Sequence, residues 1–251
     1  MAEIVYPPVI GAAVTMFKVL GMKINIEGAE NIPTTGGAVL VSNHISYLDF
    51  LFAGFGARPA NRLVRFMAKK EVFDHRISGP LMRGMHHIAV DRAEGAGAYI
   101  AALKALKAGE VVGVFAEATI SQSFTVKEIK NGAVRMAAAT NVPLIPMSLW
   151  GTQRLWTKGR PRKIMQRNIP VTISIGEPMR PQRREDMDAA TAELHRRLSE
   201  LVDKAQRSYP DDGAGTWWQP AHLGGTAPTP EEAAALDEAE RKERANRGES
   251  E

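Results

Sequence analysis

Short apolar runs alternate along the chain with segments whose apolar residues recur at helical spacing. Runs typical of strands lie within residues 23–33, 36–44, 62–73, 87–90, 111–117, 142–151 and 169–178. The periodicity of helices is found in residues 47–57, 98–110, 131–140 and 184–209. Buried strands alternating with helices favour an α/β fold. We predict a mixed, mostly parallel central sheet covered by helices on both faces.

The two ends of the chain differ in character from this body. Residues 7–24 are apolar but contain two lysines, so they predict an amphipathic helix rather than a span of about 20 apolar residues. That helix either lies on a membrane surface or packs on the core. We divide the chain into this helix (1–24), a body (25–209) and an extension (210–251). Trp217 and Trp218 are expected to pack the extension onto the body, whereas its acidic end is expected to be disordered.

Charge is unevenly distributed. The chain has 32 basic and 28 acidic residues, a net charge of +4. Residues 228–251 hold eight acidic and four basic side chains, which leaves +8 on the rest. A basic body suits anionic partners such as phosphorylated molecules or an anionic membrane. There is no cysteine, which excludes disulfides and cysteine nucleophiles. We expect no metal site, because His86 and His87 lack a second ligand pair at metal spacing.

The stretch VSNHISYLDF, residues 41–50, ends one of the buried strands. Ser46 and Asp49 fit a variant of the capping box at the start of the next helix. That pattern leaves Asn43 and His44 unexplained. Because the chain reverses between His44 and Asp49, their side chains can converge. A carboxylate on one imidazole nitrogen fixes the tautomer, so the other nitrogen can take a proton from a hydroxyl.

Spacing alone does not make such a pair. His86 and Asp91 are also five residues apart, but the run between them is typical of a strand. A strand rises about 3.3 Å per residue, which would put these two residues about 16 Å apart. We therefore predict that His44 pairs with Asp49 and that His86 does not pair with Asp91.

The segment NHISYLD resembles the first motif, N-H-x-x-x-x-D, of the glycerol-phosphate and lysophosphatidate acyltransferase family. Three further blocks follow in that family's order: HHIAVDR, FAEATIS and VPLIPMSLWG. The resemblance covers about residues 25–180. It implies a glycerolphosphate acyltransferase-like fold without a cofactor. The implied reaction moves an acyl group from a co-substrate, acyl-CoA or acyl carrier protein, to a hydroxyl of a glycerol phosphate.

The resemblance also implies roles for single residues. His44 is the expected general base and Asp49 its orienting partner, with Asn43 and Ser46 in support. Arg92, at the end of the second block, is expected to bind the phosphate of the acceptor. Without the resemblance, the simpler interpretation of Arg92 is an exposed arginine paired with a neighbouring carboxylate.

The third block departs from the family pattern F-P-E-G-T-R-S. Ala118 stands where the family has glycine, and Ile120 replaces an arginine, so one phosphate-binding cation is missing. Glu117 and Thr119 are retained and are expected at the phosphate site. The candidate replacements for the lost charge are Lys69, Lys127 and Lys130.

We predict an O-acyltransferase of phospholipid synthesis that acylates the sn-2 hydroxyl of 1-acyl-glycerol 3-phosphate, giving phosphatidate. Two alternatives stay open: an acceptor that is glycerol 3-phosphate or another lipid hydroxyl, and a membrane- or nucleic-acid-binding module on a dead acyltransferase fold. No nucleic acid partner is expected. The basic segment 151–168 predicts contact with an anionic membrane or with the donor's phosphates. We expect a peripheral protein on the cytoplasmic face of a membrane.

Overall fold

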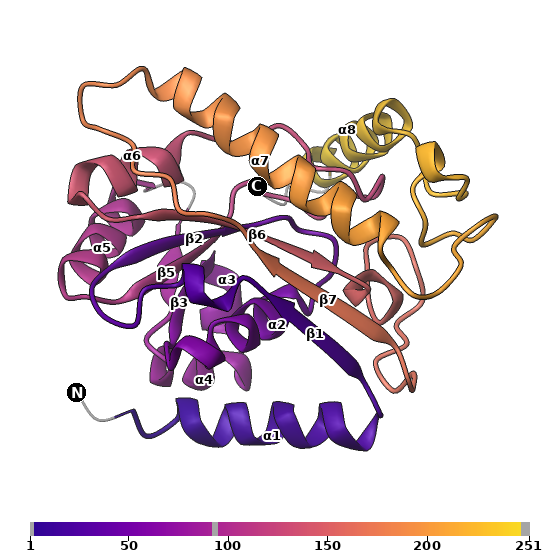
Figure 1. Ribbon diagram of the computed structural model, residues 1–251, viewed down its shortest axis with the longest axis horizontal. Coiled ribbons are helices and arrows are strands. Elements are labelled where there is room, and N and C mark those ends of the chain that lie inside the picture. The colour runs from indigo at the N-terminus through magenta and orange to yellow at the C-terminus, as the bar shows by residue number, and fades with distance from the viewer. Residues whose placement is uncertain (1–2, 92–94, 247–251) are drawn as a thin grey trace.

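Seven strands form the centre of the molecule in the order β1-β7-β6-β2-β5-β3-β4 (Figure 1). The computed structural model describes residues 3–91 and 95–246. The strands are β1 (Lys23–Glu27), β2 (Ala38–Ser42), β3 (Val64–Lys69), β4 (Ile88–Val90), β5 (Val111–Phe115), β6 (Leu144–Trp150) and β7 (Pro170–Ile175). Neighbouring strands are parallel except β6 and β7, which are antiparallel. The predicted mixed, mostly parallel sheet is confirmed.

Helices cover both faces of this sheet, as Figure 1 shows. They are α1 (Tyr6–Val19), α2 (Asp49–Gly56), α3 (Lys70–Asp74), α4 (Ser78–Gly84), α5 (Gly95–Lys107), α6 (Gly132–Thr140), α7 (Met187–Arg207) and α8 (Pro230–Asn246). Short 3-10 helices lie at Ala29–Asn31, Arg58–Ala60, Thr152–Arg154 and Ala221–Leu223. Residues of α1 and α2 join the core on one face, and residues of α5, α6 and α7 join the core on the other.

Strand β2 shows why the sequences of the strands are nearly unbroken apolar runs. All five of its residues are buried. Ala38 and Leu40 pack with α1 and α2, whereas Val39 and Val41 pack with α5 and α6. Successive strand residues point to opposite faces, so a strand that is covered on both sides must be apolar at nearly every position.

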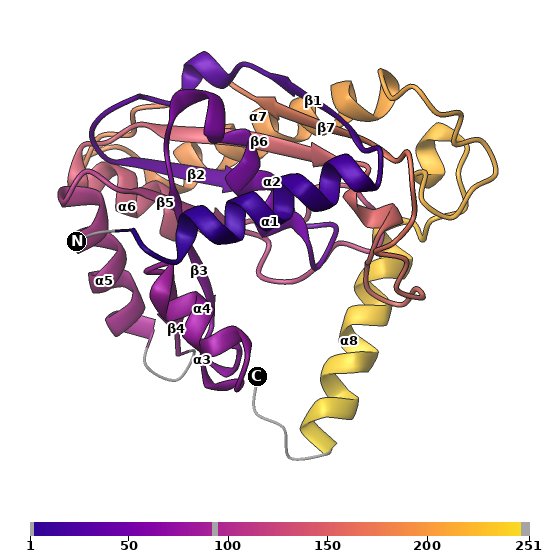
Figure 2. The same ribbon diagram turned by 90° about the horizontal axis from the view of Figure 1, so that it is seen from below.

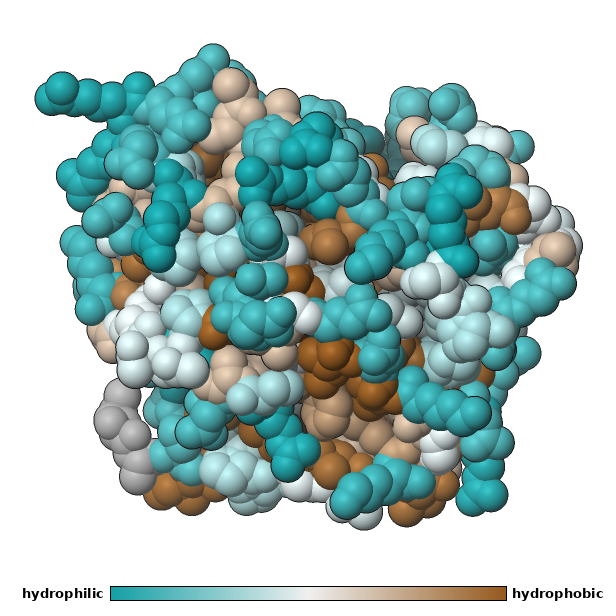
Figure 3. Space-filling model, viewed as in Figure 1, coloured by the Kyte–Doolittle hydropathy of each residue, from teal (hydrophilic) through white to brown (hydrophobic). Residues whose placement is uncertain are grey.

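The N-terminal helix packs on the body through one side. Phe17 stacks on Phe52 of α2 with ring centroids 4.8 Å apart, and the Tyr6 hydroxyl donates to the Val64 carbonyl at 2.8 Å. Ile4, two residues before the helix, and Val19, its last residue, are exposed. In Figure 3 hydrophobic surface gathers on the lower part of the visible face, the part formed by α1 and its neighbours. Across residues 3–91 and 95–246, no helix is both long and apolar enough to cross a bilayer.

The C-terminal extension differs from its predicted disorder. Trp218 is buried and lies edge-on to Tyr209, with ring centroids 5.6 Å apart, so the expected packing of the tryptophans is present. Beyond it, α8 is helical where the sequence predicts a disordered tail. Thr229 and Glu232 form a reciprocal capping box: each side chain accepts from the other's main-chain N–H, at 3.2 and 2.9 Å. Such a box lowers the free energy of helix initiation, and the composition of the tail concealed it.

Candidate active site

The polar residues of the motifs meet at one edge of the sheet. Strands β2, β5 and β6 are neighbours and parallel, so their carboxyl ends reach the same side. The loops that leave these ends are residues 43–48, 116–131 and 151–169. In open α/β sheets, ligands bind outside the carboxyl ends of the strands.

His44 and Asp49 form the predicted pair. Nδ1 of His44 lies 3.0 Å from Oδ2 of Asp49. The imidazole stacks on the Phe115 ring at the end of β5, with ring centroids 4.5 Å apart. The Asp49 side chain is fully buried, whereas 21% of the His44 side chain is exposed. A substrate can therefore reach the histidine while the carboxylate stays out of water.

The Asp49 carboxylate is held by four donors. Oδ2 also accepts from the main-chain N–H groups of Ile45 and Ser46, both at 2.7 Å. Oδ1 accepts from the Thr152 hydroxyl at 2.6 Å. An ionised carboxylate is stabilised by such hydrogen bonds. Asp49 therefore fixes the path of the reversing loop and the orientation of His44 together.

Ser46 does not cap the helix, which corrects the expectation drawn from the capping-box pattern. Helix α2 begins at Asp49 without a side-chain cap. The Ser46 hydroxyl donates to the Trp156 carbonyl at 2.7 Å and accepts from the Leu48 N–H at 3.1 Å. Asp49 instead folds back over the residues that precede it, so its carboxylate satisfies loop N–H groups rather than helix N–H groups. Ser46 supports the loop by tying it to residue 156.

Asn43 extends the sheet with its side chain. Its Nδ2 donates to the Leu149 carbonyl at 3.0 Å, and its Oδ1 accepts from the Leu149 N–H at 2.8 Å. The amide thus mimics one more strand residue between β2 and β6 and is almost fully buried. This contact sets where the chain leaves the strand just before His44.

Glu117 contacts main-chain groups rather than standing open to a phosphate. Its Oε1 accepts from the His44 N–H at 2.9 Å and its Oε2 from the Lys127 N–H at 3.1 Å. Burial raises the pKa of Glu117 to about 8; the N–H groups and Lys127 oppose that rise, and the Asp49 carboxylate adds to it. Both of its oxygens are engaged by main-chain N–H groups of the protein, and a carboxyl group offers a phosphate no positive charge. The geometry corrects the predicted role of Glu117: it positions the His44 main chain.

The remaining residues predicted for the phosphate site lie in different settings. Arg92 is outside the described residues. The Thr119 hydroxyl accepts from Nζ of Lys127 at 2.6 Å, and Lys130 is exposed. Lys69 ends β3, at the same edge of the sheet. The Ile120 side chain is only 4% exposed.

Ala118 adopts the conformation for which the family's glycine is suited. Its φ is +63°, in the left-handed region, where a Cβ atom costs about 1–2 kcal/mol. The strained turn directs Glu117 inwards and Thr119 outwards. The departure from glycine therefore leaves the path of the loop intact at a cost in stability.

His86 and Asp91 do not pair with each other, as predicted. Asp91 pairs with Lys70 at 2.9 Å, whereas His86 lies 3.4 Å from Glu3. These two residues have separate partners because β4 lies between them.

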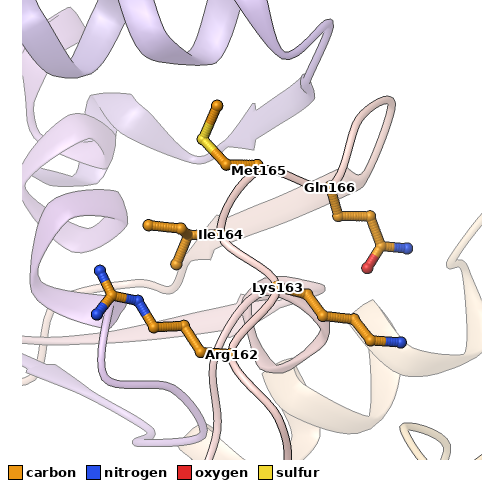
Figure 4. A pocket seen from close by; sticks show the side chains of 5 residues that line it. All are labelled: Arg162, Lys163, Ile164, Met165 and Gln166. Carbon is orange, nitrogen blue, oxygen red and sulfur yellow. The ribbon is translucent and has the colours of Figure 1, made fainter.

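The basic segment contributes a surface hollow. It has a volume of about 570 Å³ and is lined by Arg162, Lys163, Ile164, Met165 and Gln166. In Figure 4 Ile164 and Met165 point towards the N-terminal elements and Lys163 and Gln166 point away from them. None of the predicted site residues lines this hollow. Arg162 stacks over Trp156 at 4.6 Å, and Trp156 packs on Tyr47 with ring centroids 4.7 Å apart. The segment therefore braces the loop that carries His44.

The sequence model of the Acyltransferase family matches residues 23–150, which is about half of the chain and includes strands β1 to β6. The chain belongs to the Acyltransferase family. The predicted family and enzyme class, an O-acyltransferase, are thereby confirmed.

Similar proteins extend this match beyond the family segment. The chain is 29% identical over 191 residues to a 1-acyl-sn-glycerol-3-phosphate acyltransferase of Bacillus subtilis, covering 72% of this chain and 89% of that one. It is 33% identical over 184 residues to one of Limnanthes douglasii, covering 69% of this chain but 60% of that one. The crystal structure of the 1-acyl-sn-glycerophosphate acyltransferase PlsC from Thermotoga maritima superposes with a TM-score of 0.68 at 25% identity, covering 82% and 81% of the two chains.

Sequence reasoning missed two contacts of this acyltransferase that the fold creates. Thr152 holds Asp49 although 103 residues separate them. The Thr157 hydroxyl donates to the Ile45 carbonyl at 2.6 Å. Both threonines follow β6 within the segment treated as a basic loop, where the abundance of positive charge hid them. The only local signal was their place at the carboxyl end of a strand.

Proposed function

We propose that this acyltransferase transfers an acyl chain from a thioester, acyl-CoA or acyl carrier protein, to the sn-2 hydroxyl of 1-acyl-glycerol 3-phosphate. The observation that carries the proposal is the contact of His44 Nδ1 with the buried Asp49 carboxylate at 3.0 Å. It holds the proton on Nδ1 and leaves Nε2 to accept one. A relative's substrate, stated in its name, supports the choice of acceptor.

The reaction then needs no covalent enzyme intermediate. Nε2 of His44 takes the proton of the acceptor hydroxyl as its oxygen attacks the thioester carbonyl. The tetrahedral intermediate collapses, the carbon–sulfur bond breaks, and the imidazolium returns its proton to the leaving thiolate. The buried Asp49 carboxylate stabilises the imidazolium between these two steps.

A lipid acceptor requires access from a membrane, and we propose that the protein works as a peripheral protein on the cytoplasmic face. The exposed Ile4, two residues before α1, and Val19, its last residue, supply apolar contacts. The segment 151–168 supplies six basic side chains and no acidic one. Each basic residue near an anionic leaflet contributes about 1 kcal/mol. Sedimentation with anionic and with neutral vesicles tests this attachment: equal binding to both contradicts the role of the basic segment.

The activity is tested by supplying long-chain acyl-CoA with either lysophosphatidate or glycerol 3-phosphate and following thiol release and the lipid product. We expect phosphatidate from lysophosphatidate. His44→Ala should abolish turnover and leave the circular dichroism spectrum unchanged. His222→Ala removes a half-exposed histidine of the extension and should leave turnover intact. Full turnover of the His44 variant would refute the mechanism, and turnover of glycerol 3-phosphate alone would reassign the acceptor.

A further inference from the structure

One carboxylate of the C-terminal helix bridges two lysines beside the active site. Oδ2 of Asp237 lies 2.5 Å from Nζ of Lys127, and Oδ1 lies 2.6 Å from Nζ of Lys158. Lys127 also donates to the Thr119 hydroxyl, and Lys158 pairs with Glu240. Burial raises the pKa of Asp237, but its hydrogen bonds with both lysines outweigh this and lower the pKa below its ordinary value. The result is an anion held by two cations and near a hydroxyl.

This arrangement lies close to the general base. Glu117 accepts from the main-chain N–H of Lys127 with one oxygen and from that of His44 with the other. The main chains of Lys127 and His44 are therefore separated by the width of one carboxylate group and its two hydrogen bonds. An acceptor whose hydroxyl reaches His44 carries its phosphate only a few bonds away. Lys158 follows Thr157, whose hydroxyl donates to the Ile45 carbonyl, so both lysines belong to loops that contact the His44 loop.

Helix α8 is held on the body mainly by these charges. Of its side chains whose burial is described, Ala233 alone is buried. Asp237 and Glu240 are half-buried and the others are exposed. Figure 2 shows α8 projecting from the edge of the molecule, its far end away from the sheet. Segments with few buried apolar contacts open at low free energy, so an anion that competes for the lysines can release the helix.

We propose that Lys127 and Lys158 bind the phosphate of the acceptor, and that Asp237 occupies this place until the acceptor displaces it. The two lysines supply the positive charge that is missing because Ile120 stands where the family has an arginine. A phosphate monoester carries more negative charge than one carboxylate and has three acceptor oxygens, so it can bind both lysines and the Thr119 hydroxyl at once. This inference rests on the proposed function, because it takes the acceptor to be a phosphate ester.

Steady-state kinetics with acyl-CoA and lysophosphatidate tests the two halves of the proposal. Losing a hydrogen bond to a charged group should raise the acceptor KM of Lys127→Ala and of Lys158→Ala at least about tenfold. Asp237→Asn weakens the competing anion and should lower the acceptor KM about threefold or more. The donor KM should change less than twofold (about the error of such fits) in all three variants.

Matched variants control for general charge effects. Glu238→Gln removes an acidic residue of α8 that pairs with Lys242 in the same helix, and Lys107→Ala removes an exposed lysine of α5. Both should keep the acceptor KM of the wild type. A rise in the donor KM of the lysine variants would assign the site to the donor's phosphates and overturn the proposal. So would an acceptor KM in Asp237→Asn that equals the wild-type value.

Hydrogen exchange of α8 provides a measurement that does not need turnover. Glycerol 3-phosphate, compared with glycerol at equal ionic strength, should speed exchange of the α8 amides in the wild type. In Lys127→Ala exchange should already be faster and should not respond. If the wild type fails to acylate lysophosphatidate, the proposed function is wrong, and the exchange response alone then decides this inference. Turnover without any exchange response would leave the proposed function in place and refute the role of Asp237.

Discussion

Replacing Glu117 with glutamine should change how the stability of the protein depends on pH. Burial raises the folded-state pKa of Glu117 to about 8, against an ordinary value of 4.5. Between these two pH values the folded protein keeps a proton that the unfolded chain has released. The stabilisation is therefore complete below pH 4.5 and is lost as the pH rises through 8. The difference between the two pKa values limits this loss to about 5 kcal/mol.

The glutamine variant is destabilised for a different reason. An amide has one acceptor oxygen where the carboxyl group has two, so the N–H of either His44 or Lys127 faces an NH2 group. A buried donor without a partner costs about 1–3 kcal/mol. At pH 5 we therefore expect the variant to unfold at a lower urea concentration than the wild type. Because glutamine does not titrate, the difference should shrink as the pH rises and vanish or reverse by about pH 8.

Urea unfolding at several values from pH 5 to 9 measures both effects. Glu128→Gln changes an exposed carboxylate on the same loop and should follow the wild type throughout. A difference between Glu117→Gln and the wild type that stays constant with pH would show that Glu117 does not titrate in this range. A difference that grows with pH would show that the wild type gains stability relative to the variant as the pH rises, the opposite of what a raised pKa predicts. Either result refutes the reasoning from burial.

Three further substitutions test the loops around His44. Asp49→Asn removes the charge that stabilises the imidazolium and should lower kcat at least about a hundredfold, measured by thiol release. Thr152→Val removes one donor to Asp49 and should cost about 1–3 kcal/mol of unfolding free energy, measured with urea; an unchanged midpoint contradicts the buried hydrogen bond. Ala118→Gly relieves a positive φ but adds freedom to the unfolded chain, so it should stabilise by at most about 1 kcal/mol. A clear loss of stability would contradict the strain at residue 118.

The fold could be predicted from the sequence where the signal was local. Residues 38–41 and 111–115 are apolar throughout and lie in strands covered on both faces. The antiparallel placement of β7 had no such signal. Its residues alternate like those of any strand, and its direction is set by the path of the segment after β6. Direction depends on contacts between distant residues, which spacing along the chain does not encode.

The contacts of the candidate site likewise divide into a local one, which the sequence predicted, and long-range ones, which it did not. The contact between His44 and Asp49 spans five residues and followed from the turn between them. Glu117 was predicted at the right edge of the sheet but with the wrong contacts, since its link to His44 spans 73 residues. Asp237 lies 110 residues from Lys127 in a segment whose composition indicated disorder. A motif specifies residue types, whereas the partner of each side chain depends on which loops the fold brings together.

The buried position of Ile120 shows why a missing motif residue does not by itself mean a missing charge. An arginine at a site that is 4% exposed would have to bury its guanidinium or move the turn, and desolvating an unpaired charge is costly. Lys127, later in the same loop, keeps 27% of its side chain exposed and shares Glu117 with His44. The binding of a phosphate depends on where the positive charge lies in space and not on which residue of the chain supplies it. A lysine outside the motif can therefore meet the requirement while Ile120 packs the turn beneath it.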